Sequence, residues 1–129
     1  MSSRENSLKE AKKLLSELKE SGLPIIVEGR NDEKALRTLG ITNPVLRVSE
    51  KPGPVQKKVA EDLRKETKAK SAIILTDPDR EGAKLANLVA QTLEDFGMHP
   101  VMHFRKMTKL FGKSAVEQLA NVCELVDEG

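Results

Sequence analysis

The chain opens with apolar residues at the spacing of one helical face. These positions are Leu8, Ala11, Leu14, Leu15 and Leu18. Ser7 and Glu10 form the pattern of a capping box at the start of this segment, and Gly22 follows its end. The pattern predicts an amphipathic N-terminal helix over about residues 7–20.

Beyond this helix, short apolar runs alternate with segments of helical spacing. The apolar runs predict buried strands at Ile25–Val27, Val45–Val48, Ser71–Leu75 and Val101–Phe104. Helical spacing predicts a short helix capped by Asn31 and ended by Gly40, a helix through residues 55–63, a helix over Arg80–Phe96 and a last helix from Ser114. Strands and helices are therefore expected to alternate along the whole chain.

This alternation predicts the fold class. Consecutive strands joined by helices form right-handed crossovers and a parallel sheet. We predict an α/β fold of three layers, an α/β/α sandwich in which a Rossmann-like four-stranded parallel sheet lies between helices. The 129 residues fit a single domain, with the N-terminal helix followed by a core over about residues 22–126.

Composition excludes several classes of protein. Apolar runs are far shorter than the ~20 residues of a membrane span, and the polar N-terminus lacks a secretory signal, so no membrane partner is expected. Cys123 is the only cysteine, which excludes an intrachain disulfide and a thiolate zinc site and favours the cytoplasm. Because the chain has no tyrosine, it cannot form a tyrosyl covalent intermediate.

Acidic residues follow two of the predicted strands. Glu28 ends the first strand, and Asp77 and Asp79 follow the third on either side of Pro78. Ligands of parallel sheets bind at the carboxyl ends of the strands, and three carboxylates without nearby His or Cys suit Mg²⁺ or Mn²⁺. For Glu28 and Asp77 to share a metal, the first and third strands must be neighbours, which predicts the strand order 2-1-3-4. The plainer alternative is that Asp77 caps a helix and Glu28 pairs with a surface lysine.

Two motifs resemble those of a known family. Val27-Glu28-Gly29 and Thr76-Asp77-Pro78-Asp79-Arg80-Glu81-Gly82 resemble the two signature motifs of the Toprim domain, which topoisomerases, bacterial primases and nucleases of repair and RNA processing share. The resemblance covers residues 22–126 and is closest in style to the small ribosomal-RNA maturation nucleases of the family. It implies a stand-alone Toprim protein.

The resemblance also implies roles for these residues. Glu28 would be the general acid/base and a metal ligand, Asp77 a ligand bridging two Mg²⁺ sites, and Asp79 a ligand of the second. Gly29 would allow close backbone approach, and Gly82 would pack the helix start against the strand. Ala83 stands where type IA topoisomerases carry a further Glu. The resemblance therefore leaves undecided whether the centre holds one Mg²⁺ ion or two, with Mn²⁺ as a substitute for Mg²⁺.

Basic residues gather after the fourth predicted strand. The segment from His99 to Lys113 contains no acid and four bases, namely Arg105, Lys106, Lys109 and Lys113. By the predicted topology it leaves the same sheet edge as the carboxylates, so it can follow a nucleic-acid backbone, although a solvated loop is the alternative. Arg30 and Arg80, inside the two motifs, are further candidates for phosphate contacts.

These observations favour one function and leave another open. The leading hypothesis is a Mg²⁺-dependent enzyme that cleaves phosphodiester bonds of RNA or DNA, with Glu28 handling the proton. The alternative is a non-catalytic nucleic-acid-binding module that a metal organises within a larger complex. A phosphatase that uses Asp77 as nucleophile would carry this motif after its first strand, not its third. Without a tyrosine, the chain is not a topoisomerase on its own.

Overall fold

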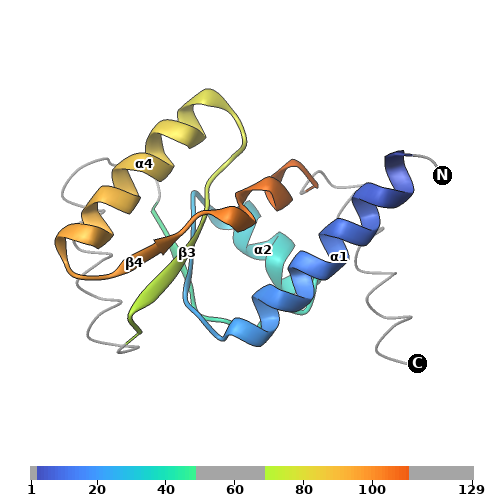
Figure 1. The fold of residues 1–129 in the computed structure, drawn as a ribbon, viewed down its shortest axis with the longest axis horizontal. Helices are drawn as coiled ribbons and strands as arrows, with labels where there is room; N and C mark the ends of the chain where they lie inside the picture. The colour runs from blue at the N-terminus through green and yellow to red at the C-terminus, as the bar shows by residue number, and fades with distance from the viewer. Residues whose placement is uncertain (1–2, 49–68, 111–129) are drawn as a thin grey trace.

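The computed structural model describes residues 3–48 and 69–110, whose arrangement Figure 1 shows. Several sequence predictions lie outside these residues. They are the helices through 55–63 and from Ser114 and the phosphate contact of Lys113.

Within each described segment, 3–48 and 69–110, strands and helices alternate as the sequence predicts. In chain order the elements are α1 (Ser3–Ser21), β1 (Ile25–Val27), α2 (Arg30–Thr38), β2 (Val45–Arg47), β3 (Ser71–Leu75), α4 (Arg80–Asp95), β4 (His99–Val101) and the 3₁₀ helix η1 (His103–Leu110). None of the described helices is long and apolar enough to cross a membrane.

The four strands form one parallel sheet in the order β2-β1-β3-β4, which confirms the predicted order. In the centre of the sheet, β1 pairs with β3 so that Val27 lies opposite Leu75. On its other side, β1 pairs with β2 so that Val27 lies opposite Arg47. The three strands therefore end at the same level, and the residues after them leave the sheet at one edge.

Helices cover both faces of the sheet, so the three-layer prediction is confirmed (Figure 1). Alternate strand residues face opposite ways because side chains on a strand point to its two sides in turn. Ile25 and Val27 pack with α1, α2 and η1 on one face. Ile26 packs with α4 on the other. The strands are thus buried on both sides.

The fourth strand corrects the sequence prediction. It covers His99–Val101, not Val101–Phe104, and Pro100 is tolerated because β4 lies at the edge of the sheet. Phe104 and Met107 are buried among residues of α1 and lie three positions apart, which is the repeat of the 3₁₀ helix that carries them. The apolar run after Val101 therefore continues as a helix that packs on α1.

Two helix starts also differ from the prediction. The N-terminal helix begins at Ser3, so Ser7 lies inside it. The cap of α2 is Gly29, not Asn31, and its main-chain N–H donates to the carboxylate of Asp32 at 3.0 Å. An acid near a helix N-terminus is favourable because it complements the unpaired N–H groups there.

A buried asparagine joins α1 to the sheet. Asn43, between α2 and β2, donates from Nδ2 to the carbonyl of Leu18 at 3.1 Å and to the carbonyl of Leu23 at 2.9 Å. Both carbonyls belong to the segment where α1 ends and the chain turns into β1. The amide therefore satisfies backbone acceptors that the end of a helix leaves without intrahelical partners.

Replacing Asn43 by Ala should lower the free energy of unfolding by about 1–3 kcal/mol, because it removes the amide donor from the carbonyl of Leu23. The carbonyl of Leu18, in contrast, keeps the Ser21 hydroxyl as a donor. Urea unfolding of the two proteins measures the difference. Thr42→Ala, at the exposed neighbouring position, is the control and should stay close to wild type. Equal unfolding midpoints for Asn43→Ala and wild type would show that the amide does not hold α1 to the sheet.

Candidate metal centre

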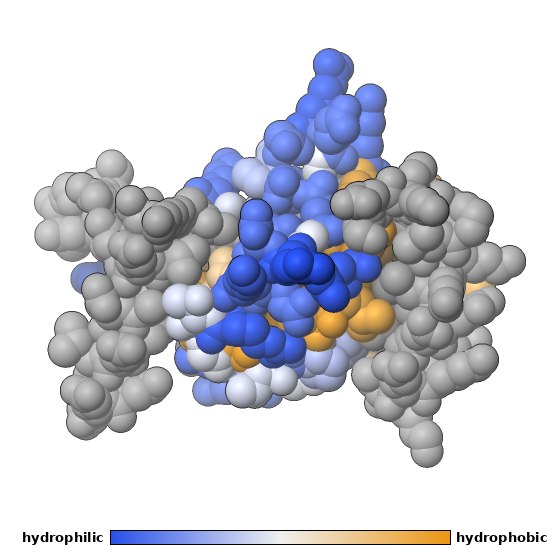
Figure 2. Space-filling model, turned by 180° about the vertical axis from the view of Figure 1, so that it is seen from behind, coloured by the Kyte–Doolittle hydropathy of each residue, from blue (hydrophilic) through white to orange (hydrophobic). Residues whose placement is uncertain are grey.

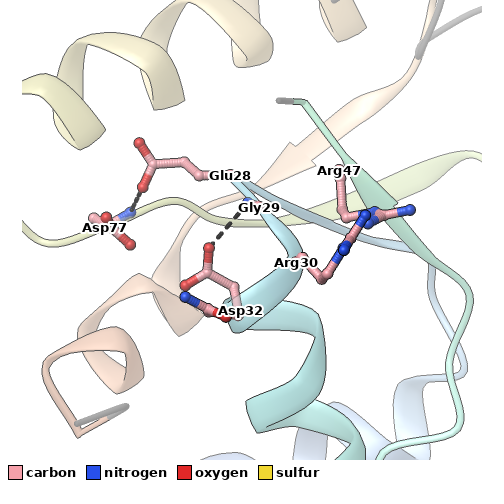
Figure 3. A pocket seen from close by; sticks show the side chains of 7 residues that line it. Glu28, Gly29, Arg30, Asp32, Arg47 and Asp77 are labelled. Atoms are coloured by element: carbon pink, nitrogen blue, oxygen red, sulfur yellow. Dashed lines mark hydrogen bonds between the residues drawn. The ribbon is translucent and has the colours of Figure 1, made fainter. Parts of the chain in front are cut away.

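Three carboxylates meet at the edge where β1 and β3 end. Glu28 follows β1, Asp77 lies two residues beyond β3, and Asp32 lies in the first turn of α2. One oxygen from each carboxylate lies within 4.8 Å of the other two. Figure 3 shows the three acidic side chains on one side of Gly29. The pairing of β1 with β3 therefore brings together residues that are far apart in the sequence.

Main-chain hydrogen bonds orient two of these carboxylates. The N–H of Asp77 donates to Oε2 of Glu28 at 2.7 Å, and the N–H of Gly29 donates to Oδ2 of Asp32 at 3.0 Å (Figure 3). Each bond uses a peptide group at the end of a strand or at the start of α2. The positions of the acids are thus fixed by the backbone of the sheet edge.

The crowded acids hold protons more tightly than isolated ones. Burial first, and then the neighbouring carboxyl of Asp77, raise the pKa of Glu28 from 4.5 to about 7, against the opposing effect of the Asp77 N–H. Burial and the charge of Asp77 also raise the pKa of Asp32, although the N–H of Gly29 opposes them. The charged forms of Glu28 and Asp32 are therefore disfavoured in the protein, and a positive charge beside these carboxylates would stabilise those forms.

The carboxylates line an open cavity of about 940 Å³. Its other lining residues are Gly29, Arg30, Asn31 and Arg47. Arg30 and Arg47 lie on the side of Gly29 opposite the acids, and their side chains are directed toward one another in Figure 3. One wall of the cavity is thus acidic and another is basic.

The turn of the second motif ties β3 to α4. Asp79 caps α4, since its carboxylate accepts the N–H of Gly82 at 2.6 Å, and the hydroxyl of Thr76 donates to the carbonyl of Gly82 at 2.7 Å. A Cβ atom at position 82 would collide with the main-chain carbonyl of Asp77. Only glycine lets α4 start this close to the strand. Asp79 lies outside the three-carboxylate cluster, and its role as a metal ligand stays a prediction.

Three cavity residues were not predicted as site residues, namely Asp32, Arg47 and Asn31, the last of which was expected only as a helix cap. Asp32 looks like an ordinary acid in the first turn of a helix, and only the turn at Gly29 brings it back beside Glu28. Arg47 ends β2 opposite Val27. Because ligands of parallel sheets bind at the carboxyl ends of the strands, the reasoning that pointed to Glu28 and Asp77 also points to Arg47.

The basic segment after β4 is partly engaged within the protein. Arg105 is half-buried and donates to Thr76 and to the carbonyl of Asp77. Lys106 forms a 2.9 Å ion pair with Glu10 of α1. Lys109 is exposed on η1, and Arg80 is exposed at the start of α4. Arg105 and Lys106 thus contact the protein itself, and the phosphate contacts of the segment stay predictions.

Comparison with known proteins agrees with this geometry. The Toprim domain family matches residues 24–107, which contain both acidic motifs. UPF0292 proteins are similar over most of their length. The one from Pyrococcus abyssi is 31% identical over 87% of this chain and 80% of its own. The one from Methanosarcina barkeri is 30% identical over 94% of this chain and 83% of its own.

A solved structure extends the similarity to three dimensions. A protein from Aquifex aeolicus superposes with a TM-score of 0.64 and 31% identity over 75% of this chain and 86% of that one. Toprim domains act on nucleic acids and generally bind Mg²⁺. Glu28 and Asp77 stand at the strand ends where the two motifs place them, and Asp32 joins them from the first turn of α2. The family match and the site agree, and this chain belongs to the Toprim domain family.

Proposed function

We propose that the protein is a Mg²⁺-dependent nuclease that cleaves phosphodiester bonds of RNA or DNA in the cytoplasm. The observation that carries the proposal is the convergence of Glu28, Asp32 and Asp77 in an open cavity with a basic wall. An acidic cluster binds the cation, and a basic wall binds a phosphate. Metal ions can activate the phosphate and the attacking water, and arginines bind phosphate oxygens, so both walls suit phosphodiester cleavage.

The donor set fits a hard divalent cation. Carboxylate oxygens are the protein ligands that Mg²⁺ and Mn²⁺ prefer, and no histidine or cysteine belongs to the cluster among the described residues. The raised pKa values of Glu28 and Asp32 support the same conclusion, since a bound cation would favour the charged carboxylates that burial and the neighbouring carboxyl of Asp77 disfavour. We propose Asp79 as ligand of a second ion, which requires its carboxylate to serve both the ion and the cap of α4.

The residues of the chain divide the chemistry among them. A bound divalent cation supplies charge neutralisation at the phosphate and lowers the pKa of a bound water. Glu28 would accept the proton of the attacking water and return it to the leaving oxygen, because its carboxylate lines the cavity beside the other two acids. Arg30 and Arg47 would hold the phosphate of the substrate at the basic wall.

The surface beside this wall suits a polyanion. Figure 2, seen from behind relative to Figure 1, shows a hydrophilic middle of the molecule. On α2, exposed polar or basic residues continue from the cavity, namely Arg30, Asn31, Lys34 and Arg37. We propose that nucleic acid approaches along this helix.

One observation favours a second candidate function. Ala83 offers no ligand at the position where related enzymes carry an additional acid. A single-metal site would suit a non-catalytic nucleic-acid-binding module that works within a larger complex. Such a module would bind RNA or DNA but would not cleave the nucleic acid, whichever divalent metal is present.

Changing Asp77 to Asn should abolish cleavage and weaken Mn²⁺ binding by at least about a hundredfold, since even outer partners of metal ligands contribute about 10- to 100-fold. Calorimetric titration with Mn²⁺ and Mg²⁺, together with a cleavage assay on labelled RNA and DNA, measures both effects. Unfolding in urea is the control and should stay close to wild type. A fully active variant would exclude Asp77 from the centre, and tight metal binding without cleavage by wild type would favour the non-catalytic module.

The pKa of Glu28 gives a test that needs no substrate. Because the folded pKa of about 7 exceeds 4.5, the folded chain binds the proton more tightly, so this residue costs stability as the pH rises from 4.5 through 7. Glu28→Gln removes that cost and should raise Tm above wild type at pH 8 but not at pH 4, both in chelator. The same variant should be inactive. A variant with a lower Tm at pH 8 would contradict the raised pKa.

Removing the two arginines should weaken binding of a labelled nucleic acid in proportion to the phosphates they contact. Arg30→Ala and Arg47→Ala should each lower the slope of log K against log salt concentration by about 0.7 to 0.9. Lys70→Ala is the matched control, because it removes the same charge from an exposed position directly before β3, at the sheet edge opposite the cavity. Equal slopes for all three variants would place the substrate elsewhere.

A further inference from the structure

We propose that Arg105 is a positioning residue of the metal centre, which holds the main chain that carries Asp77 and does not itself contact nucleic acid. The proposal rests on the proposed function, because a metal centre is what the position of Asp77 serves. It replaces the phosphate contact that the sequence suggested for Arg105 by a role within the protein.

Arg105 lies against the end of β3. Its Nη2 donates to the carbonyl of Asp77 at 2.8 Å, and its Nε donates to Oγ1 of Thr76 at 3.1 Å and to the carbonyl of Thr76 at 3.4 Å. Two nitrogens of one planar group thus bind two consecutive residues of the main chain. The guanidinium is suited to this because its donors are held in a rigid fork.

The sheet itself cannot supply these hydrogen bonds. On one side β3 pairs with β1 as far as Leu75, but on the other side it pairs with β4 only as far as Ile73. Beyond Val101 the chain leaves the sheet and turns into η1. Thr76 is fully buried, and a buried carbonyl without a donor is costly. Arg105, near the start of η1, supplies donors where β4 has ended.

The same contacts reach the metal ligands. The peptide N–H of Asp77 donates to Glu28, and the carbonyl of Asp77 accepts from Arg105, so this residue is held from both sides. The hydroxyl of Thr76, which accepts from Arg105, donates in turn to the carbonyl of Gly82. Arg105 therefore fixes the point at which β3, α4 and η1 meet. A shift of this point would move Asp77 relative to Glu28.

This arrangement argues against a phosphate contact by Arg105. The side chain is half-buried, and the two nitrogens described above are bound to the protein. Lys109, on the same 3₁₀ helix, is exposed and is the better candidate for a contact with a polyanion. The two residues thus form a matched pair in which one cation is used internally and the other faces solvent.

Three variants test the proposal: Arg105→Gln, Arg105→Lys and, as control, Lys109→Ala. Calorimetric titration with Mn²⁺ should show about 10- to 100-fold weaker binding by Arg105→Gln and no change for the control. Arg105→Lys keeps the charge but loses the fork, so it should recover only part of the affinity. Full recovery by Lys would mean that charge alone matters and would overturn the proposal.

The salt dependence of binding to a labelled single-stranded RNA separates the two roles. Loss of a phosphate contact lowers the slope of log K against log salt concentration by about 0.7, whereas loss of a positioning residue leaves it unchanged. We expect an unchanged slope for Arg105→Gln. A lower slope together with normal Mn²⁺ affinity would overturn the proposal in favour of a direct contact.

Amide hydrogen exchange tests the proposal without metal or substrate. In chelator, the N–H of Asp77 should exchange at least about tenfold faster in Arg105→Lys than in wild type, while the amides of β1 keep their protection. If the wild-type protein binds no Mn²⁺, the proposed function is overturned. The exchange rate of the Asp77 N–H in Arg105→Lys would then be the only test of whether Arg105 holds this segment of main chain. Unchanged exchange, or faster exchange with unchanged Mn²⁺ affinity in a metal-binding wild type, would overturn the proposal.

Discussion

The pairing of β1 with β3 is the constraint on which the site depends. Because Val27 lies opposite Leu75, the residues after these strands leave the sheet at the same level, and a main-chain N–H of one segment reaches the carboxylate of the other. A slip of one residue would turn every side chain of β1 to the opposite face of the sheet. Both hydrophobic clusters oppose such a slip, since each takes alternate residues of the same strands. The core therefore fixes the relative position of Glu28 and Asp77.

Holding these acids together costs free energy, and main-chain groups beside the cluster offset part of this cost. Burial, and then the neighbouring carboxyl of Asp77, disfavour the charged forms of Glu28 and Asp32 and raise the pKa of both residues. Main-chain N–H groups at the end of β3 and at the start of α2 oppose this effect in part. A structure selected only for stability would not gather three acids at one edge. This conflict between local stability and arrangement is typical of functional sites.

The sequence predicted most of the fold because its signals are local or follow from topology. Continuous apolar runs marked the strands, and the requirement that Glu28 meet Asp77 predicted the strand order. Other features depended on contacts that no local pattern reveals. Phe104 and Met107 read as part of a strand and its loop until α1 is known to lie beneath them. Asp32 joins the acids only through the turn at Gly29. Arg105 read as a surface cation, because the early end of β4 cannot be seen in the sequence.

Cations at the sheet edge that carries the acids differ in what they contact: some bind the protein itself, and others line the cavity. On the side of η1, Arg105 binds the main chain that carries Asp77, and Lys106 forms an exposed ion pair with Glu10 of α1. On the side of α2 and β2, Arg30 and Arg47 line the cavity itself. Glu33 forms ion pairs with both Arg47, at 3.4 Å, and Arg37, at 3.7 Å. Weak, exposed ion pairs of this kind contribute little to stability and are readily exchanged for a phosphate. Arg105 is thus bound within the protein, whereas the cations of α2 and β2 remain available to a phosphate, which favours an approach of the substrate along α2.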